Sequence, residues 1–174
     1  RGVSVMGREE AAGRALIQSL SPAQNRAAQL SANKQGSNIL TEAYKDNAVV
    51  APVGISARQL SSRQRQLLLA VVKSYADQYR QELSAERLRE VEQHLDDTRF
   101  AWIGSHGVDA PIYYRIQSPV VLIEFDQQRA VSLPGDPNIP LRSHVHTVVR
   151  TPNGNDYGAD LLRQHLLEHH HSAP

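Results

Sequence analysis

The sequence predicts an α+β fold: N-terminal helices packed on a four-stranded, mainly antiparallel sheet, with a helix at the C-terminal end. In residues 1–98, apolar side chains recur with the period of a helix. From residue 99, short β-rich runs are separated by Gly or Pro, and the short connections favour antiparallel neighbours. We therefore expect a helical part, residues 1–98, and a sheet with the last helix, residues 99–171. Together they form one domain, or half of a larger one.

Helix-start signals mark the N-terminal part. Residues 9–20 carry Ala and Leu at helical spacing, and a second helix follows to about residue 30. Another helix begins at Ser84 and should form a hairpin with the helix before it. Two pairs of residues have the spacing of a capping box: Ser21 with Gln24, and Ser61 with Gln64.

Residues 31–57 lie between these helices and are rich in Asn, Ser, Gly and Ala, with one apolar patch at residues 48–50. This composition predicts a long loop with at most one short strand. A loop of this length inside a compact domain is either functional or a contact surface.

Four strands and a final helix are expected in the second part. β-branched and aromatic residues gather in four runs, residues 100–103, 112–116, 120–125 and 144–150. The final helix runs from about residue 157 to 169, with Asn155 or Asp156 as its N-cap.

Composition excludes several classes of protein. The 174 residues include 19 Lys and Arg against 18 Asp and Glu, a balance that argues against a nucleic-acid or membrane-surface binder. No apolar run approaches the roughly 20 residues of a membrane helix. Without cysteine there is no disulfide and no thiolate ligand for zinc. The chain begins at Arg1 rather than Met, so we expect that a leader, a propeptide or a longer segment has been removed.

Histidines in the last third predict a metal site. His144 and His146 are two apart on an expected strand and therefore share a face. His165 and His169 are four apart on the final helix and share its inward face. Zinc, copper or iron would suit these ligands. The alternative is that the imidazoles are hydrogen-bonded or half-exposed without a metal.

Acidic and basic residues surround this histidine cluster. Glu124 and Asp126 lie on the face of their strand opposite to its apolar residues. They could be metal ligands, groups that orient a histidine, or general bases. The alternative is that this face of the strand is simply exposed to solvent. We take both as the catalytic candidates. Asp156, Asp160 and Arg150 are expected to orient the ligands, although Asp156 could simply cap the helix. Arg115, like Arg150, could pair with the acids or receive an anionic substrate.

An ordered series of motifs resembles a known family: Phe100-Ala-Trp102, then 113–117, 123–126, 144–150, 155–162 and His165. It is similar to the domain of unknown function family 3500, found in bacteria and fungi. Members are about twice this long, which implies that the chain is a C-terminal half and that the other half completes the site. Many members look exported, which implies a periplasmic or extracellular location. The sequence departs from the family pattern at Val149 and Thr151, where Trp and Asp are usual.

The expected function is therefore that of a metal-binding exported protein, a metal-dependent hydrolase or oxidoreductase. The alternative is a non-catalytic binding or assembly subunit of a larger complex, with residues 31–57 as its contact surface. The expected partner is the missing N-terminal half or another subunit, so that the protein forms an oligomer. We expect it to bind neither a nucleic acid nor a membrane.

Overall fold

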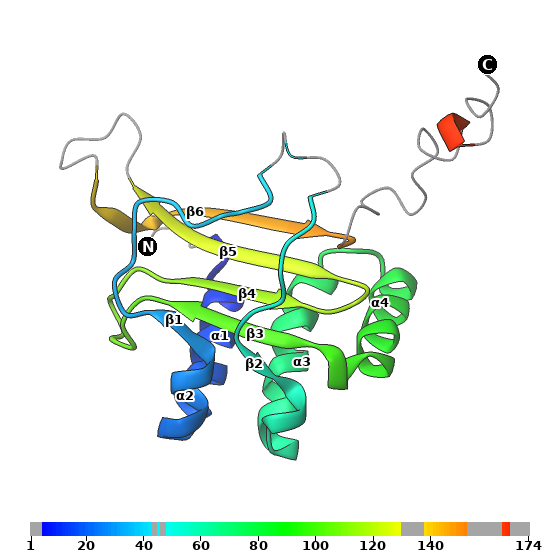
Figure 1. Cartoon of the computed structure of the whole chain (residues 1–174), viewed down its shortest axis with the longest axis horizontal. Helices are drawn as coiled ribbons and strands as arrows, with labels where there is room; N and C mark the ends of the chain where they lie inside the picture. The colour runs from blue at the N-terminus through cyan, green and yellow to red at the C-terminus, as the bar shows by residue number, and fades with distance from the viewer. Residues whose placement is uncertain (1–4, 43–44, 46–47, 130–137, 153–164, 168–174) are drawn as a thin grey trace.

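The structure, a computed structural model, describes residues 5–42, 45, 48–129, 138–152 and 165–167. Its helices and strands follow one another in this order: α1 (Gly7–Ser19), α2 (Pro22–Ala28), β1 (Gln29–Ser31), β2 (Ile55–Ser56), the 3₁₀ turn η1 (Ala57–Gln59), α3 (Ser62–Ala76), α4 (Gln81–Gln93), the 3₁₀ turn η2 (Leu95–Asp97), β3 (Arg99–Ile103), β4 (Tyr113–Gln117), β5 (Leu122–Arg129) and β6 (Pro140–Arg150). Helices α1, α2 and α3 lie on one side of the sheet, and the described residues of 32–54 cross its other side (Figure 1).

The sheet is an antiparallel meander extended at one side. Its order is β1-β3-β4-β5-β6, and β2 also pairs with β3. The pairs β3–β4, β4–β5 and β5–β6 are antiparallel, which confirms the predicted meander, while β1 runs parallel to β3. Within the described residues the sheet therefore has six strands rather than four. The two additional strands have three and two residues, too few for an alternating pattern to reveal.

Aromatic rings form the centre of the core between the sheet and the helices. The ring of Tyr114 stacks on Phe125 at 5.0 Å and on Trp102 at 6.4 Å. All three side chains are fully buried. Helix α1 approaches this row closely at Gly13, where a Cβ would lie 2.5 Å from a carbon of the Tyr114 ring. The absence of a side chain at Gly13 therefore allows this contact between helix and sheet.

Capping explains where the helices begin. Ser21 with Gln24 starts α2 and Ser61 with Gln64 starts α3, each through a reciprocal capping box, as predicted. Helix α4 begins at Gln81, three residues before the predicted Ser84. The Ser84 side chain is buried and lies within hydrogen-bond distance of the Asp77 carboxylate, and it does not cap the helix.

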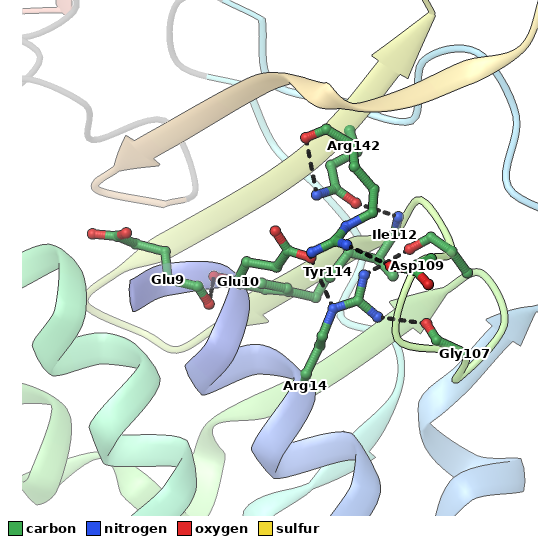
Figure 2. A network of polar contacts seen from close by, with 10 residues as sticks. Glu9, Glu10, Arg14, Gly107, Asp109, Ile112, Tyr114 and Arg142 are labelled. Atoms are coloured by element: carbon green, nitrogen blue, oxygen red, sulfur yellow. Dashed lines mark hydrogen bonds and ion pairs between the residues drawn. The ribbon is translucent and has the colours of Figure 1, made fainter. Parts of the chain in front are cut away.

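A network of ions fixes the outer strand relative to the first helix (Figure 2). Arg14 on α1 donates to Glu10 at 2.9 Å and to two backbone carbonyls of the β3–β4 loop, those of residues 107 and 110. Arg142 on β6 binds the same Glu10 at 2.7 Å and Asp109 at 3.1 Å. Helix, loop and outer strand are therefore linked by Arg14 and Arg142, which share Glu10.

Residues 165–167 are helical, and the remainder of the helix expected at 157–169 lies outside the described residues. Within the part of the chain that the structure describes, no helix is long and apolar enough to span a membrane.

Candidate functional site

The face of the sheet turned away from the helices carries polar side chains from three strands. Residues directly opposite on antiparallel strands project to the same face. Tyr113 lies opposite Asp126, and Arg115 lies opposite Glu124. Asp126 in turn lies opposite His146 on β6. The predicted catalytic acids therefore share a face with Arg115 and with one of the predicted metal ligands.

Glu124 is fully buried and binds the segment that crosses this face. Its carboxylate accepts hydrogen bonds from the backbone N–H of Leu40 at 3.0 Å and of Thr41 at 2.9 Å. It also accepts from the hydroxyls of Thr41 and Tyr113, each at 2.6 Å. Burial raises the pKa of Tyr113, so its hydroxyl stays a donor. Four donors occupy the four acceptor positions of a carboxylate, so Glu124 anchors residues 40–41.

Asp126 is a second anchor on the same strand. It is fully buried and lies 2.8 Å from the ammonium of Lys34, whose side chain is only 4% exposed. It also accepts from the backbone N–H of Asn38 at 2.7 Å and from Gln128 at 3.0 Å. Burial lowers the pKa of Lys34, and the contact with Asp126 acts against this effect. Both acids lie beneath residues 34–41 and not on a solvated face.

These contacts bear on the expected catalytic role of Glu124 and Asp126. Because the four acceptor positions of Glu124 are taken by protein donors, it must break one of these bonds before it accepts a proton. Asp126 has three such contacts, one of them the ion pair with Lys34. Their arrangement favours anchoring over proton transfer, and the catalytic role stays a prediction.

A pocket of about 640 Å³ lies between the crossing segment and the sheet. Residues 48–51 and 53 line its outer side. Its other lining residues include three from β3 and β4: Ile103, Tyr113 and Arg115. Most lining side chains are apolar, and the volume is within the range of small-molecule sites, about 300–1,000 Å³.

Backbone carbonyls attach the outer wall of this pocket to arginine and glutamine side chains of the sheet. Gln117 donates to Val50 at 2.7 Å, and Arg99 donates to Gly54 at 3.0 Å. Arg150 donates to the carbonyls of residues 42 and 45. The structure therefore places Arg150, predicted as an orienting residue for metal ligands, at the attachment of this wall.

Arg115 is the buried charged group of the pocket, which the more exposed Lys45 also lines. Arg115 is 2% exposed, and its Nη2 donates to the carbonyl of Ala51 over a long 3.2 Å. Its Nε and Nη1 are buried and have no hydrogen-bond partner among the described residues. A buried guanidinium normally fills its donor positions, because an unpaired buried donor costs on the order of 1–3 kcal/mol, and more when it is charged.

The two strand histidines contact each other, as expected from their spacing. Their Nε2 atoms are 2.9 Å apart, and the ring planes meet at 82°. The Nδ1 of His144 lies 2.6 Å from the carbonyl oxygen of Arg129. His144 is half-buried and His146 is exposed.

The remaining predicted ligands are not gathered with this pair among the described residues. His165 is exposed. His169, Asp156 and Asp160 lie outside the described residues. Where the structure is described, no group of three or more His, Asp or Glu is close enough together to hold a metal ion.

Comparison with known proteins places the chain in a family. Residues 1–159 match the family described as protein of unknown function DUF3500. The chain belongs to this family. The match supports the resemblance read from the motifs, and it does not support the further expectation that the chain is a C-terminal half. No curated protein and no solved structure matches the DUF3500 chain.

Sequence reasoning found Glu124, Asp126 and Arg115 but not their surroundings. The short connection between β4 and β5 could have indicated that Tyr113 and Arg115 lie opposite the two acids. Nothing in the sequence indicates that Lys34, about 90 residues away, pairs with Asp126, because that contact depends on how the crossing segment folds over the sheet.

Proposed function

We propose that this DUF3500 protein binds a small organic anion with an apolar body in the pocket between residues 48–53 and the sheet. One observation carries the proposal: Arg115 is buried beside an apolar pocket, and two of its guanidinium nitrogens have no partner within the part of the chain that the structure describes. A carboxylate or phosphate group would supply the acceptors, since the planar guanidinium suits both. Valine, alanine and isoleucine side chains of the pocket would contact the apolar body.

Binding requires a small movement of the outer wall. The two nitrogens without partners among the described residues are buried, so an anion reaches them only after a local movement. We infer that residues 50–51 move, because Arg115 is bonded to the Ala51 carbonyl. This shift breaks the hydrogen bond from Arg115 to Ala51, which is the longest of the three described bonds that tie residues 50–54 to side chains of the sheet. A charge-assisted bond to an anion is stronger than the bond to a carbonyl that it replaces.

Binding fits the described residues better than catalysis does. Glu124 and Asp126 are held by protein donors, whereas Arg115, which lines the pocket, has two buried nitrogens without a partner among the described residues. The expected metal-dependent hydrolase or oxidoreductase activity stays a prediction, because only two of its four histidines contact each other among the described residues.

Calorimetric titration with three probes of the same length tests the proposal. Octanoate and octyl phosphate carry an anionic group, whereas octan-1-ol lacks the charge. We expect both anions to bind the purified chain and the alcohol to bind at least tenfold more weakly. Equal affinity for the alcohol, or no binding of either anion, would contradict the proposal.

Two variants locate the binding. Arg115→Gln removes the charge and should weaken octanoate binding at least tenfold. Arg99→Gln is the matched control, because Arg99 also donates to the outer wall but does not line the pocket. We expect it to bind octanoate with unchanged affinity. If both variants lose binding equally, the effect belongs to the wall and not to the Arg115 charge, and the proposal fails.

A further inference from the structure

The geometry of the pair His144 and His146 fixes the position of one ring hydrogen. A carbonyl oxygen only accepts hydrogen bonds, so the Nδ1 of His144 carries a hydrogen and donates it to Arg129. The Nε2 of the neutral ring then carries a lone pair, and this lone pair faces the Nε2 of His146. When both rings are neutral and no metal is bound, His146 therefore donates its Nε2 hydrogen to His144.

This arrangement resembles the way proteins prepare a histidine for a metal. A ligating histidine usually donates its second ring N–H to a backbone carbonyl or a carboxylate, which fixes the tautomer and the orientation of the ring. The carbonyl of Arg129 does this for His144. Arg129 is itself held, since its backbone N–H donates to the carbonyl of Gly36 at 2.8 Å. The orientation of the His144 ring, and with it the direction of its Nε2, is therefore set by Arg129 and, through Arg129, by Gly36.

The separation of the two nitrogens suits adjacent ligands of one ion. With bonds of about 2.0–2.1 Å, two nitrogens at a right angle lie about 2.9 Å apart, and at a tetrahedral angle about 3.3 Å. The observed separation between the Nε2 atoms is 2.9 Å. A right angle is the geometry of tetragonal copper(II) and nickel(II) sites. The pair would have to open by a few tenths of an ångström for tetrahedral zinc.

We propose that His144 and His146 form a two-histidine site for a divalent transition metal, with copper(II) bound most tightly. Both ligands come from β6, and the carbonyl of Arg129 on β5 orients one of them. Because His146 is exposed and His144 is half-buried, water completes the coordination. The order of affinities follows from the general preference of nitrogen ligands, in which copper(II) exceeds nickel(II) and zinc(II). This site is smaller than the four-histidine cluster that the sequence suggests.

The test uses the full chain without a tag, after removal of metal with a chelator. Because His169, His170 and His171 also bind copper in principle, all three are replaced by Ala in the starting protein. Titration with copper(II) is followed by calorimetry and by electron paramagnetic resonance, which counts the nitrogen ligands. We expect one ion per chain, a spectrum with two imidazole nitrogens, and weaker binding of nickel(II) and zinc(II).

Point variants then assign the ligands. His144→Ala and His146→Ala should each weaken copper binding at least tenfold and remove one nitrogen from the spectrum. His94→Ala is the matched control and should change neither. Binding that persists in both strand variants would overturn the proposal by showing that copper binds elsewhere on the surface. Binding that disappears with the three C-terminal histidines would also overturn it, by placing the site at the tail.

Discussion

Arg115 combines two properties that rarely occur together in a core: it carries a charge, and two of its nitrogens are buried without a partner among the described residues. Stability alone favours an apolar side chain of similar length at such a position. The residue is therefore best explained by binding, in which an incoming anion supplies the missing acceptors. Sites that bind ligands are often less stable than they could be for this reason.

This conflict between stability and binding gives the first prediction. Arg115→Met removes the unpaired charge and keeps much of the side-chain volume, so the ligand-free variant should be more stable by about 1–2 kcal/mol. The lost hydrogen bond to Ala51 offsets only part of this gain. Urea unfolding of the variant and of the wild type measures the difference. Arg99→Met, at an arginine outside the pocket, should not be stabilised, and a less stable Arg115→Met would show that Arg115 is a structural residue.

Tyr114 gives a second prediction at the same scale. Its hydroxyl lies 2.7 Å from that of Tyr75 and donates to the carbonyl of Glu9 at 3.0 Å. Tyr114→Phe leaves both the Tyr75 hydroxyl and the Glu9 carbonyl without this partner, whereas Tyr75→Phe removes one bond and leaves Tyr114 bound to Glu9. We expect thermal or urea unfolding to show a loss of about 2–3 kcal/mol for the first and about 1 kcal/mol for the second. Equal losses would contradict this account of the pair.

Among the elements, the segment of residues 34–41 depends most on contacts distant in sequence. It has no helix or strand of its own, and Glu124 and Asp126 on β5 hold it on the sheet. The sequence predicted helices α1 to α4 and the four longer strands, because capping residues and apolar periodicity are local signals. It predicted residues 31–57 only as a loop, because the path of this loop is decided by buried carboxylates about 80–90 residues away.

The pairing of Lys34 with Asp126 gives a third prediction. Asp126→Asn leaves the ammonium of Lys34 buried without a counter-charge, which should cost about 3–5 kcal/mol. Adding Lys34→Met to this variant removes the unpaired charge and should recover at least half of the loss. Urea unfolding measures both. Surface ion pairs typically contribute only about 0–1 kcal/mol to stability. If the free energy of unfolding of Asp126→Asn is within about 0.5 kcal/mol of that of the wild type, the ion pair does not hold the segment.

For the whole molecule, three buried tyrosines make stability depend on pH in alkaline solution. Burial raises the pKa of Tyr75, Tyr113 and Tyr114 above the value near 10 of an unfolded chain. A raised pKa contributes stability that is fully present below pH 10 and is lost as the pH rises further. The lowered pKa of Lys34 has the opposite effect, because it makes the stability rise with pH. This rise is complete near pH 10.5, the pKa of a lysine in an unfolded chain.

The fourth prediction is therefore a steep loss of stability above pH 10.5. Each of the three tyrosines contributes about 1.4 kcal/mol per pH unit to the slope. Tyr114→Phe should reduce the slope between pH 10.5 and 11.5 by about one third. Tyr79, which is 49% exposed, supplies the control variant Tyr79→Phe. An unchanged slope in Tyr114→Phe would show that this ring is not buried in solution.

The arrangement of the whole chain explains why the candidate site was only partly visible in the sequence. Histidine spacing predicted that His144 and His146 would meet, and strand alternation grouped Glu124 with Asp126. The pocket, in contrast, forms only when residues 48–53 cross the sheet above Arg115. Its identity as a site is a property of the tertiary structure, and no local pattern of residues encodes it.

The most direct measurement of the central claim reads the Arg115 guanidinium itself. In a nitrogen–hydrogen correlation spectrum, the side-chain Nε–H signal of Arg115 is assigned by its loss in Arg115→Gln and followed as octanoate is added. We expect a saturable downfield shift of this signal, because a carboxylate becomes its hydrogen-bond acceptor, while the Nε–H signal of Arg99 stays in place. An Arg115 signal that does not move while octanoate binds would contradict the claim that this residue receives the anion.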